Sequence, residues 1–199
     1  MNQHFKPAPR RTPTQAAEGL PRWRWTVAEI ERMTAEGVLH EDEKIELIGG
    51  EIVPMAAKGR RHEIIRGKVA MHFSRIAPLD VFVIAEPQFN LTDDSYTNPD
   101  ILVHPAALLT PDVRGEDALL VIEISDSSLG FDLNTKAPLY AAHGVIEYWV
   151  INARTLVTTM HRQLQGATYV TRQKKAASRT LTPLLVPALA VALDDFDID

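Results

Sequence analysis

The sequence predicts an α/β fold built on a mixed sheet. Residues 81–86, 100–104 and 119–125 form apolar, β-branched runs, which are typical of strands buried on both faces. Amphipathic helical patterns precede and follow these strands, at residues 62–77 and 132–144. Helices alternating with strands in this way indicate an α/β domain with a central mixed sheet flanked by helices.

The first predicted element is a short helix near the N-terminus. Thr26 and Glu29 match the capping-box pattern, in which an N-cap hydroxyl is followed three residues later by a glutamate. We expect the helix to reach Ala35, because Gly37 lies just beyond that point and glycine commonly ends helices.

A hairpin and a longer helix come next. Residues 45–55 read as two strands joined by a turn at Gly49–Gly50. Apolar residues recur at helical spacing over residues 62–77, which predicts an amphipathic helix with Arg66 and Lys68 on its outer side.

After the three central strands, residues 132–144 are predicted to form another helix. Asp132 or Asn134 would lie near its start, and Gly144 would end it. Pro138 would have to lie in the first turn, because proline inside a helix removes a hydrogen bond and clashes with the preceding turn.

The C-terminal part is predicted to add strands to the sheet. Residues 147–153 read as a strand, and residues 155–162 and 167–173 as a hairpin around Gly166. We expect the apolar tail, residues 184–196, to pack on the sheet.

Composition limits the class of protein. The 199 residues are 45% hydrophobic and 24% charged and contain no cysteine, which excludes disulfides, thiolate metal sites and cysteine nucleophiles. Residues 1–22 have no apolar core of a signal peptide and are expected to be a flexible arm, followed by a single domain at residues 23–199. The apolar run at residues 184–193 is too short to span a bilayer, so we expect a cytoplasmic protein without membrane contact. No Walker glycine loop, dinucleotide fingerprint or Gly-x-Ser-x-Gly elbow appears, so no organic cofactor is expected.

Charge is unevenly distributed along the chain. The net charge of −5 argues against coating of nucleic acid by bulk electrostatics. Residues 58–75 nevertheless hold six Lys or Arg against one Glu. The candidates for phosphate contacts in this segment are Lys58, Arg60, Arg61, Arg66 and Lys68.

Two of the apolar strands each carry one carboxylate, Asp100 and Glu123. An ionised carboxylate buried alone is costly, so each needs a cation or several hydrogen-bond donors. If the two strands pair, both groups converge, and two carboxylates with a backbone carbonyl and waters can bind Mg²⁺. The alternative is that each acid caps a sheet end or pairs with a nearby Lys or Arg.

Short motifs around these acids resemble a known family. "NPD", then "VIEIS", then "DLNTKAPLYAAHGVIEYWVIN" occur in order, with "ELIGGEIV" and the histidine of "RRHEII" upstream. This ordered set resembles the Uma-type restriction endonucleases, a branch of the PD-(D/E)xK nuclease superfamily, over roughly residues 24–197. The resemblance implies a restriction-endonuclease-like core, to which the N-terminal helix and hairpin are additions.

The resemblance also implies a site. Asp100 and Glu123 would bind Mg²⁺, or Mn²⁺ as a substitute, with the backbone carbonyl of Ile124 as a third ligand. The motif lysine of the superfamily is missing, because Ser125 occupies its position. Lys136 on the following helix would take its place, and the alternative is a solvated lysine on the helix surface.

Five further residues are weaker candidates. Glu46 matches a family glutamate and is expected to be a metal ligand, a hydrogen-bond acceptor near the ligands, or an ordinary surface acid. Glu86 would reach the metal from the next strand or remain solvated, and His62 would contact phosphate, assist proton transfer or be exposed. Asp132 would orient the catalytic lysine or cap its helix, and Tyr140 lies on the same predicted helix face as that lysine.

Three functions remain open at this stage. The first is a Mg²⁺-dependent endodeoxyribonuclease, expected to act on DNA as a homodimer because a two-fold enzyme matches duplex cuts. The second is an inert module of the same fold that binds DNA or protein. The third is a metal-dependent hydrolase of another phosphodiester.

Overall fold

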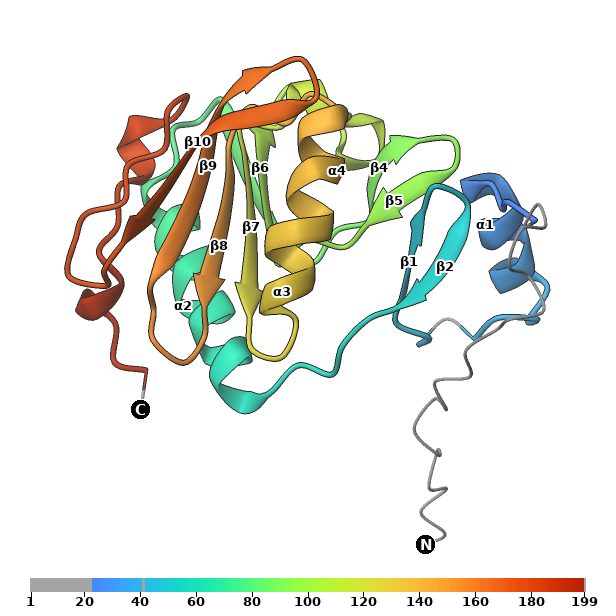
Figure 1. Cartoon of the computed structure of the whole chain (residues 1–199), viewed down its shortest axis with the longest axis horizontal. Helices are drawn as coiled ribbons and strands as arrows, with labels where there is room; N and C mark the ends of the chain where they lie inside the picture. The colour runs from blue at the N-terminus through green and yellow to red at the C-terminus, as the bar shows by residue number, and fades with distance from the viewer. Residues whose placement is uncertain (1–22, 41, 199) are drawn as a thin grey trace, which may run out of the picture.

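The computed structural model describes residues 23–40 and 42–198, so the arm expected at residues 1–22 lies outside the described residues (Figure 1). The strands form a six-stranded sheet in the order β10-β9-β8-β7-β6-β3 and a four-stranded sheet in the order β2-β1-β5-β4. The large sheet consists of β3 (Val81–Ala85), β6 (Ile101–Pro105), β7 (Leu120–Ser125), β8 (Tyr148–Asn152), β9 (Thr158–Gln165) and β10 (Thr168–Lys175). The small sheet consists of β1 (Ile45–Ile48), β2 (Glu51–Pro54), β4 (Phe89–Thr92) and β5 (Ser95–Thr97).

The large sheet is mixed, as predicted. β7 and β8 pair in parallel, and the other ladders of this sheet are antiparallel. Every residue of β7 is buried, which confirms the prediction for this strand. The same prediction was wrong for β3, where Phe82 is 46% exposed. In the described part of the chain, β3 lies at the end of the sheet order and pairs with β6 alone.

Helices cover the two faces of the large sheet (Figure 1). On one face, α2 (Arg60–Ile76) buries Ile65 and Phe73 against Ile122 and Ile124 of β7. The C-terminal segment joins this cluster through 3₁₀ turns, so the apolar tail packs in the core as predicted. On the other face, α4 (Ala137–Ala142) packs against the alternate residues of β7 and β8.

The N-terminal elements follow the sequence closely. Helix α1 (Val27–Ala35) has Thr26 as N-cap and a complete capping box with Glu29. The β1–β2 hairpin turns at Gly49 and Gly50, whose φ values of 57° and 78° are left-handed and therefore suit glycine. The short strands β4 and β5 were not predicted, and β5 joins this hairpin through the pairing of Leu47 with Tyr96.

The helix around Pro138 differs from the prediction. It begins as α3 (Leu129–Phe131), widens into a π-helical stretch at Asp132–Lys136 and continues as α4, so Pro138 does not lie in its first turn. The Ala137 N–H donates to the Asp132 carbonyl, a hydrogen bond across five residues. Widening of the turn just before a proline relieves the clash that a regular α-helix would suffer there. None of the helices in the described part of the chain is long and apolar enough to cross a membrane.

Candidate active site

Asp100 lies directly before β6 and is 2% exposed. Its Oδ2 accepts the Ile124 N–H at 2.7 Å and lies 3.0 Å from His62 Nε2. The last paired position of β6 and β7 is Ile101 with Ile122, so the Asp100 side chain takes over where the backbone ladder ends. Its other oxygen, Oδ1, accepts from Lys58 Nζ at 2.8 Å.

Glu123 lies on the face of β7 that the π-helical stretch and α4 cover. Its Oε1 accepts from Lys136 Nζ at 2.8 Å and from the Tyr140 hydroxyl at 3.2 Å. Lys136 is 5% exposed, so it points into the protein and is not a solvated surface lysine. Tyr140 is also 3.0 Å from the Thr97 hydroxyl of β5, which fixes the ring between the two sheets.

Glu46 comes from the small sheet and meets the same lysine. Its Oε1 accepts from Lys136 Nζ at 2.8 Å and from the Asn98 N–H at 3.0 Å. It is 2% exposed, so it is not an ordinary surface acid. The Lys136 ammonium therefore joins two carboxylates from two different sheets.

Asp132 lies within the π-helical stretch, and two hydroxyl groups surround it. Ser125 and Ser128 each donate to Asp132 Oδ2 at 2.6 Å. Ser125, where the resemblance predicted that a motif lysine is missing, thus helps to hold this acid. π-Helical turns often mark functional sites, and this one turns both Asp132 and Lys136 inward.

Burial and neighbouring charges shift the pKa values of Glu123 and Lys136. Burial raises the pKa of Glu123 well above its ordinary value, as do the charges of Asp100, Asp132 and Glu46, while Lys136 opposes the rise. Burial would lower the pKa of Lys136, but the surrounding carboxylates outweigh burial and raise it, so the ammonium stays charged. The carboxyl groups of the cluster thus outnumber its two ammonium groups, those of Lys58 and Lys136.

Asp100 has the opposite behaviour. Burial opposes its ionisation, but His62 and Lys58 outweigh burial and lower the pKa of this carboxyl. The pKa values of these two carboxyl groups are therefore shifted in opposite directions, and Glu123 takes up a proton more readily than Asp100.

These residues line one pocket with a volume of about 220 Å³. Its walls include Glu46, Asp100, Glu123 and Lys136, together with Ile124, whose carbonyl was predicted to be a metal ligand. Within residues 23–40 and 42–198, no group of three or more His, Asp or Glu side chains is arranged to hold a metal ion. Three of the pocket carboxylates, those of Glu46, Asp100 and Glu123, instead accept hydrogen bonds from the ammonium groups of Lys58 and Lys136.

The comparisons with known proteins agree with this architecture. Residues 27–194 match the Uma2 family model, described as "Putative restriction endonuclease". The chain belongs to this family. The fold of this Uma2 chain resembles the "crystal structure of a putative nuclease belonging to DUF820 from Anabaena variabilis", with a TM-score of 0.67 and 17% identity. The likeness covers 85% of this chain and 96% of that chain. No curated protein matches the chain.

Both the family and the fold class were therefore predicted correctly. The roles of individual site residues stay predictions, but the structure brings Glu46, Asp100, Glu123 and Lys136 together. His62, predicted to be exposed or functional, is 4% exposed and touches Asp100.

Glu86, Lys58 and Arg66 have different surroundings from those predicted. Glu86 is not solvated alone, because Lys58 and Arg66 both pair with it. Arg66 also pairs with Glu63 and is not on the outer side of its helix, which corrects the prediction. The contact between Lys58 and Asp100 was missed, and residues 42 positions apart leave no spacing signal that would reveal it.

Proposed function

We propose that this Uma2-family chain is a metal-dependent endodeoxyribonuclease. The observation that carries the proposal is the convergence of Asp100, Glu123 and Lys136 on one pocket. The family model and the Anabaena variabilis neighbour are both described as nucleases, which supports a nuclease as the general class. Metal dependence and DNA as the substrate are the finer parts of the proposal.

The residues present fit a divalent cation. Asp100 and Glu123 would hold Mg²⁺, or Mn²⁺ in its place, with the Ile124 carbonyl as a third ligand. Such an ion supplies activation of water and neutralisation of charge on the phosphate under attack. The fit rests on the excess of buried carboxylate and on Glu123 Oε2, which has no hydrogen-bond partner among the described residues.

The other side chains of the cluster would orient the attacking water, stabilise the phosphate or hold the groups that do so. Lys136 stays protonated between Glu46 and Glu123, so its ammonium would orient the attacking water or stabilise the pentavalent phosphate. The Tyr140 hydroxyl and the Glu46 carboxylate hold that ammonium and its partner in place. His62 holds the Asp100 carboxylate from the side opposite Lys58.

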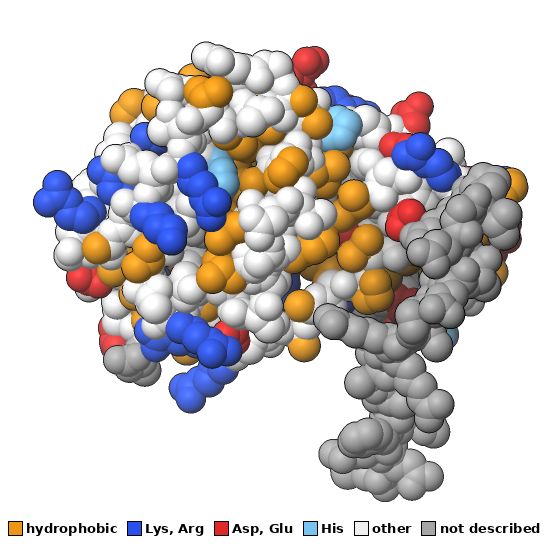
Figure 2. Space-filling view, viewed as in Figure 1, with side chains coloured by type: hydrophobic (Ala, Val, Ile, Leu, Met, Phe, Trp, Pro, Cys, Tyr) orange, Lys and Arg blue, Asp and Glu red, His pale blue; other side chains and the backbone are white. Residues whose placement is uncertain are grey.

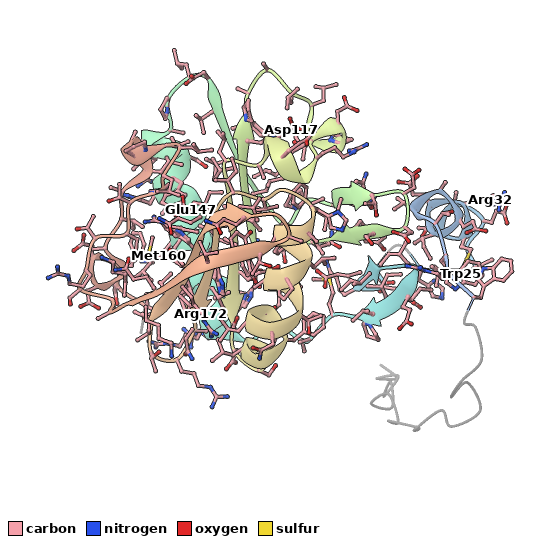
Figure 3. The ribbon with its side chains drawn as sticks, turned by 45° about the horizontal axis from the view of Figure 1, so that its top comes forward. Trp25, Arg32, Asp117, Glu147, Met160 and Arg172 are labelled. Atoms are coloured by element: carbon pink, nitrogen blue, oxygen red, sulfur yellow. The ribbon has the colours of Figure 1, made fainter. Side chains whose placement is uncertain are left out.

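DNA phosphates would contact basic side chains around the pocket. Arg60 is exposed at the start of α2, and the Arg61 Nε donates to the Ala153 carbonyl at 2.7 Å. The next residue, Arg154, is an exposed arginine that pairs with the pocket residue Asp126 at 2.9 Å. Figure 2 shows further Lys and Arg side chains over β9 and β10, and Figure 3 labels one of these, Arg172. These side chains would contact a phosphate backbone without reading the base sequence.

Two further parts belong to the same proposal. A homodimer would match the two strands of a duplex, because each protomer would cut one strand. We also propose a cytoplasmic location, because a chain without cysteine forms no disulfides and does not require an oxidising compartment.

The second candidate function is an inert nuclease-fold module that binds DNA or protein. One observation favours it: the Lys58 ammonium lies against Asp100, where a catalytic cation would bind. In this case the acid cluster would be neutralised by the chain's own lysines.

Cleavage of supercoiled plasmid with Mg²⁺ or Mn²⁺ tests the proposal. The site variant is Asp100→Asn/Glu123→Gln, which removes charge but keeps side-chain shape. The matched control is Asp194→Asn/Asp195→Asn, which removes two exposed acids from a C-terminal 3₁₀ turn. Nicking or linearisation by wild type and control, but not by the site variant, is expected. If the wild type binds DNA without cleaving it, the inert module is the better description.

A further inference from the structure

Lys58 lies on the segment between β2 and α2 and reaches into the acid cluster. Its Nζ is 2.8 Å from Asp100 Oδ1 and also pairs with Glu86. The Lys58 side chain is 21% exposed, whereas that of Asp100 is 2% exposed. The ammonium thus enters from the solvent side of a buried carboxylate.

The contacts of Asp100 divide between its two oxygens. Oδ2 accepts the Ile124 N–H and lies against His62, so it is used to hold the strand end and the first turn of α2. Among the residues that the structure describes, Oδ1 accepts only from Lys58. A cation that binds Asp100 without breaking the structural contacts must therefore approach Oδ1, where it meets the ammonium.

Glu86 is a second ion-pair partner of Lys58. Glu86 has a φ of 52°, a left-handed conformation that is uncommon outside glycine, and it directly precedes the buried Pro87. Arg66 holds its Oε2 at 3.2 Å, while Lys58 pairs with its Oε1. An ammonium displaced from Asp100 can keep its partner at Glu86 and does not have to be left unpaired.

We propose that Lys58 is an exchangeable counter-ion that competes with a divalent cation for Asp100 Oδ1 and thereby sets the metal affinity of the site. The inference rests on the proposed function, because it takes Asp100 as a metal ligand. The physical reason is that two cations on one oxygen repel strongly in a partly buried site. The metal must displace the ammonium, and its apparent affinity falls accordingly.

Mn²⁺ binding to the full chain without DNA tests the inference, by isothermal titration calorimetry at fixed pH and salt. Lys58→Gln and Lys58→Met remove the ammonium, and Lys58→Arg keeps a cation. Lys68→Gln, on the neighbouring helix α2, removes the same net charge away from Asp100 and is the matched control. Asp100→Asn removes the proposed ligand.

We expect Lys58→Gln and Lys58→Met to bind Mn²⁺ about tenfold more tightly than wild type, Lys58→Arg to stay near wild type, and Lys68→Gln to change less than twofold. Measurable binding by Lys58→Gln alone, with none by wild type, also supports the competition. Equal or weaker binding by Lys58→Gln, or an equal gain in Lys68→Gln, overturns it. If wild type binds and Asp100→Asn does not, while Lys58→Gln is unchanged, only this inference fails. If neither wild type nor Lys58→Gln binds Mn²⁺, the metal-dependent function falls with it.

Discussion

Replacing Lys136 by methionine removes the one ammonium that Glu46 and Glu123 share. Both carboxylates accept from its Nζ at 2.8 Å, and the lysine is 5% exposed. The folded variant must then either bury one more uncompensated negative charge or take up one more proton than wild type. Breaking a buried ion pair from one side costs about 3–5 kcal/mol.

The proton route makes this cost depend on pH. A glutamate has an ordinary pKa of 4.5, and holding it protonated costs about 1.36 kcal/mol for each pH unit above that value. Protonation therefore limits the loss of unfolding free energy to about 5 kcal/mol at pH 8 and to about 1.4 kcal/mol at pH 5.5. A carboxyl whose folded pKa is raised stabilises the fold at low pH and loses that contribution as pH rises. The difference in unfolding free energy between wild type and the variant should thus grow with increasing pH.

Urea denaturation followed by tryptophan fluorescence measures the difference at both pH values. We expect Lys136→Met to lose about 3–5 kcal/mol of unfolding free energy at pH 8 and less than half of that at pH 5.5. Lys174→Met on β10 is the matched control, because this lysine is exposed, and it should change stability by less than about 0.5 kcal/mol. A loss below about 1 kcal/mol at pH 8, or a loss equal at both pH values, would refute the reasoning.

Phe73→Ala should cost about 3–5 kcal/mol in the same denaturation assay, because Phe73 is fully buried between α2 and the large sheet. Thr26→Ala removes the capping box of α1 and should cost about 1 kcal/mol, seen as a lower Tm. Burial and the charge of Arg172 lower the pKa of His161 to about 4 from an ordinary 6.5. As pH falls, His161 therefore takes up a proton in the unfolded chain at a higher pH than in the folded chain, and wild type loses stability between pH 6.5 and 4. His161→Leu should flatten this part of the plot of unfolding free energy against pH. Arg154→Glu should weaken DNA binding in Ca²⁺ buffer, measured by fluorescence anisotropy, and lower the slope of log affinity against log salt by about 1–2.

The elements with strong local signals were predictable from the sequence. β7 is a largely apolar run that contains Glu123, and it is buried along its whole length. The capping box at Thr26 and the Gly49–Gly50 turn specify their structures through neighbouring residues alone. In each case the interactions that decide the structure lie within a few positions of one another.

The elements that depend on distant partners were not predictable. β5 has three residues, Ser95–Thr97, and is stable only because it lies between β1 and β4. This missed strand positions Thr97 against Tyr140 of the candidate site. The π-helical stretch was also not predicted, although Pro138 directly after it gives a local reason for the widened turn.

Local sequence also does not distinguish Glu123 of the candidate site from a second buried glutamate, because the triplet Val-Ile-Glu occurs twice. Glu123 and Glu147 each end one such triplet, and both side chains are buried. Glu147, labelled in Figure 3, accepts from Trp149 Nε1 at 2.6 Å, from Arg162 Nε at 2.7 Å and from the Leu184 N–H at 2.6 Å. Both of its oxygens are therefore used to hold the sheet against the C-terminal segment.

In the part of the chain that the structure describes, Glu123 differs from Glu147 in having an unpaired carboxylate oxygen and more negative charge nearby. Its hydrogen bonds fall on Oε1 alone, its lysine is shared with Glu46, and Asp100 and Asp132 add negative charge nearby. A buried acid whose oxygens are all paired by neutral donors and one arginine stabilises the fold and has no capacity for a ligand. A buried acid in a group with too few cations and one unpaired oxygen can still bind one. The same triplet thus has two different surroundings, and the difference arises from partners on other elements, including Glu46 of the small sheet, which shares Lys136 with Glu123.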